Sequence, residues 1–232
     1  MRIFIITDSL GLPRKGVSYE NTWTDKLLNV LQGSEANQVI AYTMLRRCLT
    51  VKEIYEEKSK FGIGYLHPDL IIFQFGVVDS ARRVIPLWLE NFIPNQERTV
   101  RHFIGKHRYQ LTKLYNLHYN SPKKFKYYLQ LLINWLEQRP RSYAFIKIAP
   151  PGDFLLARIY NIQNDIALYN DILIDTVRKY GPHGTVLDPY DGYAVEEFIL
   201  EEDGHHLNPV GEQLVFNTVY NWISQFEFLE LL

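Results

Sequence analysis

The hydrophobic residues of this 232-residue chain fall into short runs of strand length, separated by segments in which apolar positions recur with helical spacing. Trp23, Leu27 and Leu31 show that helical spacing, and so does the segment 166–173. Five apolar runs predict strands, at residues 2–6, 38–43, 69–75, 143–149 and 184–187. The alternation of strands and helices predicts an α/β fold with a mostly parallel sheet covered on both faces.

The order of these elements predicts a flavodoxin-like three-layer sandwich of about five parallel strands. We expect a single domain over residues 1–232, because no linker-like stretch divides the chain. A last helix should begin near Pro209, since proline suits the first turn of a helix. The segment between the third and fourth strands is too long for a simple crossover. It predicts a helical insertion at about 84–142.

The amino-acid composition of the chain limits the kinds of partner molecule and the location that we expect. The net charge of −1 gives no basic face for nucleic acid, so we expect no nucleic-acid partner. No apolar stretch is long enough to span a membrane, and the N-terminus lacks the pattern of a secretory signal, which predicts a cytoplasmic protein. The single cysteine, Cys48, excludes an internal disulfide and a Cys-rich metal site. The oligomeric state is left open by the sequence.

One region is basic although the chain as a whole is nearly neutral. Arginine, lysine and histidine are frequent over residues 97–118, and lysines continue over 122–136. A solvated helical face is the simpler interpretation of such a run. The alternative is a lid over an anionic substrate.

Two short segments carry candidate chemistry. Thr7-Asp8-Ser9-Leu10 follows the first predicted strand, which places Ser9 at the sheet edge where ligands bind in open parallel sheets. Asp203-Gly204-His205-His206 places an acid three residues before a histidine, so Asp203 can orient His206 as a base. The alternatives are Ser9 as a helix cap, His205 as the base and Asp203 as an ordinary turn acid.

These two segments resemble the SGNH (GDSL-type) hydrolases, which have a nucleophilic serine in a Gly-Asp-Ser-Leu block and a base in an Asp-x-x-His block. The resemblance covers essentially the whole chain and implies a Ser9-His206-Asp203 triad. It also implies an oxyanion hole of backbone N–H groups from Ser9 and Cys48, where Cys48 replaces the family's glycine. The family's Gly-x-Asn-Asp block reads Gly76-Val77-Val78-Asp79 here, so Val78 replaces an asparagine that donates from its side chain.

Arginines are candidates to replace the lost amide or to hold an anionic part of a substrate, because a guanidinium group offers several donors in a fixed geometry. The candidates follow predicted strands: Arg14, Arg46, Arg47, Arg82 and Arg83. Asp8 and Asp79 are expected to be structural acids near the site.

The resemblance extends, over residues 8–14 and 76–83, to an SGNH branch associated with bacterial surface-polysaccharide gene clusters. It implies a serine esterase that removes a small acyl group, such as acetyl, from a carbohydrate or similar ester. Two alternatives stay open: a sugar O-acyltransferase with the same triad, and a glycan-binding module with impaired catalysis. Asp203, His205 and His206 also carry metal-ligand atoms, but no second ligand cluster accompanies them, and we expect neither a metal nor a cofactor.

Overall fold

Five parallel strands form one sheet in the order β2-β1-β3-β4-β5. The computed structural model describes residues 1–32, 39–58, 62–85, 98–138 and 142–226. Its strands are β1 (Arg2–Thr7), β2 (Ile40–Leu45), β3 (Leu70–Gln74), β4 (Ser142–Ile146) and β5 (Gly184–Leu187). All five predicted strands are therefore confirmed, and so is the parallel flavodoxin-like order.

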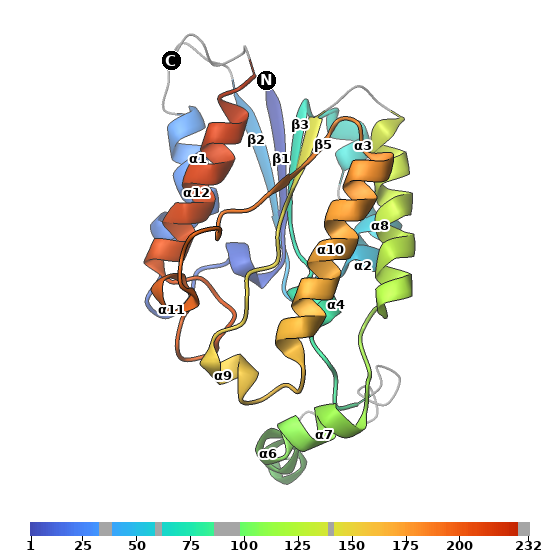
Figure 1. The fold of residues 1–232 in the computed structure, drawn as a ribbon. Coiled ribbons are helices and arrows are strands. Elements are labelled where there is room, and N and C mark those ends of the chain that lie inside the picture. The colour runs from blue at the N-terminus through green and yellow to red at the C-terminus, as the bar shows by residue number, and fades with distance from the viewer. Residues whose placement is uncertain (33–38, 59–61, 86–97, 139–141, 227–232) are drawn as a thin grey trace.

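Helices cover both faces of this sheet and complete the three layers (Figure 1). The helices α1 (Trp23–Gln32) and α12 (Pro209–Ile223) pack on one face, and α2 (Val51–Glu57), α8 (Pro122–Glu137) and α10 (Ile162–Tyr180) pack on the other. Successive side chains of β1 point to opposite faces, so Ile3 and Ile5 contact the first layer while Phe4 and Ile6 contact the second. Both faces of β1 are therefore buried, as its continuous apolar run predicts.

Short helices fill the connections between these layers. Two are 3-10 turns, η1 (Ser9–Gly11) and η2 (Tyr19–Asn21). The remaining short α-helices are α3 (Ile63–Leu66), α4 (Val77–Ser80), α9 (Asp153–Leu156) and α11 (Val195–Phe198). The helix α12 begins at Pro209, as predicted, and the Asn208 side chain caps it by accepting from the N–H groups of Val210 and Gly211.

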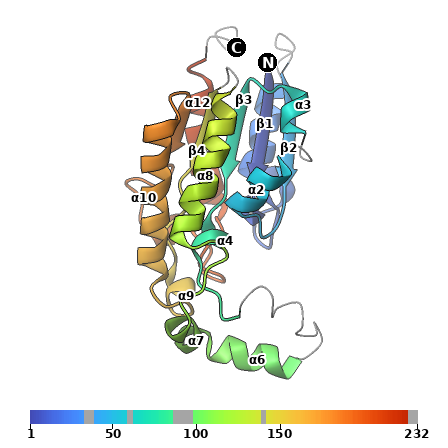
Figure 2. The same ribbon diagram turned by 90° about the vertical axis from the view of Figure 1, so that its right-hand side faces the viewer.

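The described residues between positions 98 and 138 are largely helical, and their helices differ in position. The helices α6 (Arg98–Lys106) and α7 (Arg108–Leu114) project beyond the end of the sheet (Figure 2). In contrast, α8 buries Phe125, Leu129 and Leu132 against the sheet and is a regular layer helix. The described part of the insertion proper is thus α6 and α7, and residues 86–97 lie outside the described part of the chain.

The sheet order brings three loops together at one edge. From β1, which is second from the edge of the sheet, the chain moves to β2 on one side, and it then returns to β3 on the other side of β1. A reversal of this kind opens a crevice at the carboxyl ends of the strands. Ser9 follows β1, Cys48 follows β2 and Gly76 follows β3. The fold therefore gathers the three sequence segments with candidate chemistry at a single place.

Candidate active site

The loop after β1 holds Ser9 through hydrogen bonds on both sides of it. Asp8 is fully buried, and its Oδ1 accepts from the Leu10 N–H at 2.9 Å. The Arg14 Nη2 donates to the carbonyls of Ser9 at 2.6 Å and Leu12 at 2.8 Å. Arg14 therefore lies beside Ser9, and its guanidinium group binds the loop's own backbone.

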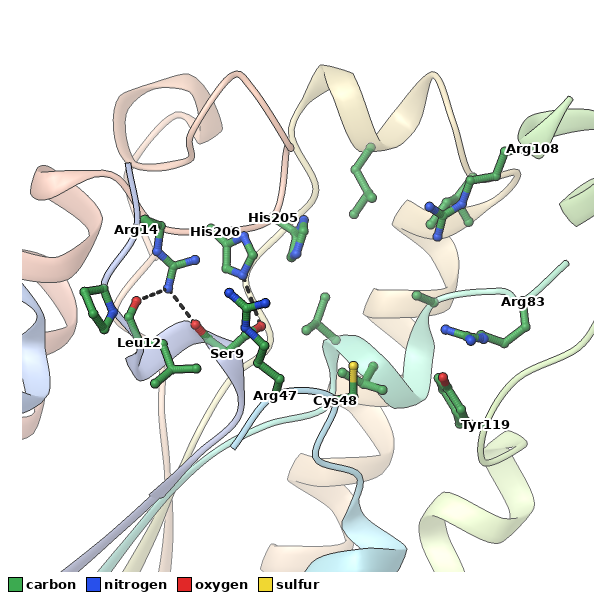
Figure 3. Close-up of a pocket in the computed structure, with 16 residues that line it drawn as sticks. Ser9, Leu12, Arg14, Arg47, Cys48, Arg83, Arg108, Tyr119, His205 and His206 are labelled. Carbon is green, nitrogen blue, oxygen red and sulfur yellow. Dashed lines mark hydrogen bonds between the residues drawn. The ribbon is translucent and has the colours of Figure 1, made fainter. Parts of the chain in front are cut away.

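Ser9, His206 and Asp203 form a continuous hydrogen-bonded chain (Figure 3). The His206 Nε2 lies 3.0 Å from the Ser9 Oγ, and its Nδ1 lies 2.7 Å from the Asp203 Oδ2. With the ring proton on Nδ1, the imidazole donates to the carboxylate and its Nε2 accepts from the serine hydroxyl. The Asp203 Oδ1 accepts from the backbone N–H groups of His205 and His206, which fixes the acid itself. The alternative base, His205, makes no contact of this kind with Ser9 among the interactions of the described residues.

A glycine shapes the turn that presents this histidine. Gly204 has a φ of 70°, in the left-handed region that favours glycine, and a Cβ there would lie 2.6 Å from the Leu155 nitrogen. Its carbonyl accepts from the Gly152 N–H at 2.8 Å. The turn is therefore fastened directly to the backbone around α9, and the sequence Asp-Gly-His-His gives the acid and base a rigid support.

Ser9 and His206 open onto a cavity of about 380 Å³. Its floor and sides are largely apolar, with Leu12, Pro13, Val77, Val78, Ala81, Leu155 and Ile159. Cys48 lines it as well and has a φ of 57°, so this cysteine adopts the left-handed conformation that glycine takes most easily. Val78, from α4, presents an apolar side chain to the cavity. The volume suits a small substrate or one ring of a larger one.

The arginines that the sequence singles out separate into two groups. Arg14, Arg47 and Arg83 line the cavity. Arg46 is held outside it, at 2.7 Å from Glu53 and 3.1 Å from Glu57 on α2.

Arg82, next to Arg83, is buried away from the cavity and pairs with Asp165 of α10 through two hydrogen bonds, at 2.6 and 3.1 Å. Arg46 and Arg82 therefore join elements of the fold. The structure does not bring them to the cavity.

Sequence reasoning did not assign Arg108 or Tyr119 to the site, yet both line the cavity. Arg108 is the first residue of α7, and the guanidinium group of Arg83 lies over the Tyr119 ring at 3.9 Å. The only sequence signal for Arg108 is its place in the basic region at 97–118. Arg98 and Arg101 of that region have side chains outside the described part of the structure.

Three buried carboxyl groups lie beneath the site. Burial raises the pKa of Asp8 and of Asp79 to about 7. The Asp79 carboxylate accepts from the Val51 N–H and the Asn120 side chain, so it joins the loops after β2 and β3. Glu212 of α12 accepts from the Trp23 N–H at 2.8 Å, and burial raises its pKa to about 7 as well. Asp8 and Asp79 thus both accept hydrogen bonds from backbone N–H groups of the loops around the site.

The Asp203, His205 and His206 side chains bring their ligand atoms within 4.8 Å of one another. The Asp203 carboxylate is already engaged by two backbone N–H groups and by His206. These hydrogen bonds favour a catalytic use of the cluster over metal binding. None of the described helices is long and apolar enough to cross a membrane.

No protein-family model matches the chain, and no curated protein matches it in sequence. Solved structures of esterases do match it in fold. The acetylxylan esterase Axe2 from Geobacillus stearothermophilus superposes with a TM-score of 0.64 at 11% identity, over 100% of this chain and 97% of that one. The chain shares its fold with esterases.

Two further structures support that statement. The acetyl xylan esterase AlAXEase has a TM-score of 0.66 at 16% identity, over 96% of this chain and 100% of that one. The psychrotrophic esterase EstA from a Pseudoalteromonas species has a TM-score of 0.60 at 13% identity, over 97% of each chain. The shared fold is the one that the resemblance to SGNH hydrolases implies.

Proposed function

We propose that this protein is a serine esterase of SGNH type that removes a small acyl group, in particular acetyl, from a carbohydrate ester. One observation carries the proposal: the hydrogen-bonded chain from Ser9 through His206 to Asp203, which opens onto a cavity at the sheet edge. A nucleophile within reach of a base that an acid orients is the diagnostic arrangement for acyl transfer. The chain shares its fold with proteins named acetylxylan esterases, and those names refer to an acetylated sugar polymer. This similarity favours a carbohydrate ester as the substrate.

In the first step His206 Nε2 takes the Ser9 proton while the Ser9 Oγ attacks the ester carbonyl. Asp203 stabilises the imidazolium that forms, and it remains ionised. The backbone N–H groups of Ser9 and Cys48 hold the oxyanion of the tetrahedral intermediate. As the intermediate collapses, His206 gives its proton to the departing sugar hydroxyl, and the acyl group stays on Ser9. A water molecule, deprotonated by His206, then releases the acid and restores the serine.

The two oxyanion donors rest on local backbone geometry. Cys48 has a left-handed φ, a conformation that glycine adopts most easily, and any residue but proline keeps the backbone N–H. The side chain of Val78 supplies no donor. We therefore expect a working esterase whose turnover is limited on this side of the site.

Release of p-nitrophenol from p-nitrophenyl acetate tests the proposal, with Ser9→Ala beside the unaltered protein. We expect the variant to lose about a thousandfold or more of kcat, because the nucleophile is gone. Ser224→Ala, at the far end of α12, is the matched control and should retain full activity. Equal rates for Ser9→Ala and the unaltered protein would overturn the mechanism, and so would absence of activity on both this ester and acetylated sugars.

Acyl transfer to a sugar is the second candidate. A cavity of about 460 Å³, between α2 and the start of α8, adjoins the first, and the two share Cys48 and Tyr119. An acceptor sugar in that cavity would approach the acyl group on Ser9 in place of water. In the same assay, a product that forms only when an acceptor sugar is added would favour this candidate over hydrolysis.

A further inference from the structure

Arginine is prominent among the described residues that line the cavity in front of Ser9. Four arginines line it, Arg14, Arg47, Arg83 and Arg108, and no acidic side chain is among its described lining residues. A partly buried cavity lined by several guanidinium groups favours a negatively charged occupant.

Arg14 is less available to a bound anion, because its guanidinium group already donates to the protein backbone. Its Nη2 donates to three backbone carbonyls of the nucleophile loop, and its Nε is buried without a hydrogen-bond partner among the described residues. Its role is to hold Ser9 in position. The other three arginines come from separate elements and converge on the cavity.

Arg83 and Arg108 lie away from Ser9, beyond Cys48 in the view of Figure 3. Two contacts hold Arg83 in position. Its guanidinium group stacks on the Tyr119 ring, and its backbone N–H donates to the Leu117 carbonyl. The Arg108 Nε is buried and has no hydrogen-bond partner in the described structure. Burial of donors without partners costs free energy, which an anion at this position recovers.

The two guanidinium groups also repel each other. Burial lowers the pKa of Arg108 from its ordinary value, and the nearby charges of Arg158 and Arg83 lower it further. Arg158 follows α9 and lies over the Phe154 ring at 5.0 Å. A bound anion reduces this repulsion, so the charges themselves favour an anionic ligand.

We propose that the substrate is an anionic ester, with a carboxylate, sulfate or phosphate group bound by Arg83 and Arg108 while Ser9 attacks the acyl carbon. The inference rests on the proposed esterase function and names its substrate class. A cavity of about 380 Å³ accommodates one acylated sugar ring that carries both the ester and the charge. Arg47, exposed at the rim, attracts the same charge as the substrate enters.

A pair of substrates that differ only in charge tests this: an O-acetylated methyl glucuronoside and the corresponding uronamide. We expect kcat/KM for acetate release to be about tenfold to a hundredfold higher for the acid, because its carboxylate receives charge-assisted hydrogen bonds. Arg83→Gln and Arg108→Gln should each remove most of that preference, because each lowers kcat/KM for the acid more than kcat/KM for the uronamide. Arg108→Lys should restore part of it, since the charge returns without the planar donor set.

Arg178→Gln is the matched control, because Arg178 pairs with Asp175 near the end of α10 and lies outside the cavity. It should keep the full preference for the acid. Equal kcat/KM for acid and uronamide in the unaltered protein would overturn the proposal. So would arginine variants that lose both substrates equally.

Competition assays distinguish the source of the charge. Glucuronate, glucose 6-sulfate and glucose 6-phosphate compete with p-nitrophenyl acetate, with glucose as the neutral control and the ionic strength held constant. Inhibition by at least one anion, lost in Arg108→Gln, supports the proposal and identifies the group. Inhibition by none overturns it.

Binding to the Ser9→Ala variant separates this inference from the esterase function. Methyl glucuronoside should bind this variant at least tenfold more tightly than methyl glucuronamide does, and Arg108→Gln should abolish the difference. A protein that binds the anion but hydrolyses no ester would refute the esterase proposal alone. A protein that hydrolyses esters and shows no preference in this binding assay would refute the anion site alone.

Discussion

The two walls of the active-site cavity are built on different principles. On one wall, Ser9, His206 and Asp203 satisfy one another and are held by backbone groups around them. On the other wall, Val78 offers no donor, and Arg47, Arg83 and Arg108 bring positive charge to the cavity. Under the proposed function, the first wall sets the type of reaction and the second wall sets the choice of substrate.

The largest expected effect comes from changing the acid of the first wall, Asp203. Asp203→Asn keeps the shape of the side chain but favours the wrong imidazole tautomer, so we expect kcat to fall by about 10⁴-fold. Activity on p-nitrophenyl acetate measures this. The same variant should bind anionic sugars as before, because the second wall is unaltered. A fall of less than about tenfold would show that Asp203 does not orient the base.

Neighbouring arginines give the next largest effect, this time on stability. Arg82→Gln leaves Asp165 buried and unpaired, so the free energy of unfolding should fall by about 3–5 kcal/mol. Arg83→Gln, one residue later, should change it by no more than about 1 kcal/mol. Urea denaturation of both variants measures the difference. Equal losses would mean that Arg83 has a structural role like that of its neighbour.

The pH dependence of stability tests the protonation state of Glu212, which is buried beneath the site. The pKa of Glu212 is about 7 in the folded protein and about 4.5 when the chain is unfolded, so its contribution to stability is fully present below pH 4.5 and is lost as the pH rises through 7. Glu212→Gln cannot ionise. The free energy of unfolding of the unaltered protein, relative to this variant, should therefore fall by about 3 kcal/mol between pH 4.5 and 7 and stay level above.

Denaturant unfolding at several pH values measures that difference. Asp8 and Asp79 also have raised pKa values, but both are present in the two proteins and cancel in the comparison. Parallel stability curves across this pH range would exclude a neutral buried Glu212.

The smallest expected effect concerns the donor that the second wall lacks. Val78→Asn adds a side-chain amide at the cavity, and we expect kcat for p-nitrophenyl acetate to rise about tenfold. Val78→Leu, which adds bulk but no donor, is the control and should not raise it. No gain from the asparagine would indicate that another group already serves the oxyanion, and Arg47 is then the residue to change next.

Much of the fold could be predicted because its signals are local. The apolar run at 2–6 must be buried on both faces, and a buried strand in an alternating α/β chain goes to the middle of a parallel sheet. The nucleophile and base were predictable for a similar reason. Each lies in a short segment directly after or before a regular element, and the topology brings those ends to the same edge.

The arginines could not be sorted in this way, because a side chain's direction depends on partners far along the chain. Arg46 and Arg47 are neighbours, yet acids on α2 hold only the first. Arg82 and Arg83 differ because Asp165, 83 residues from Arg82, is buried next to one of them. Arg108 lies in a basic run that is otherwise mostly solvent-exposed where its side chains are described, and nothing local distinguishes it from its exposed neighbours.

The contact between Ser9 and His206 joins residues 197 positions apart. During synthesis the serine is made among the first residues and its base almost two hundred residues later, so the growing chain carries an inert hydroxyl for most of that time. Reactivity arrives only when the sheet has assembled and the His206 turn has docked on α9. If the proposed mechanism holds, folding is therefore the step that brings the base to the nucleophile.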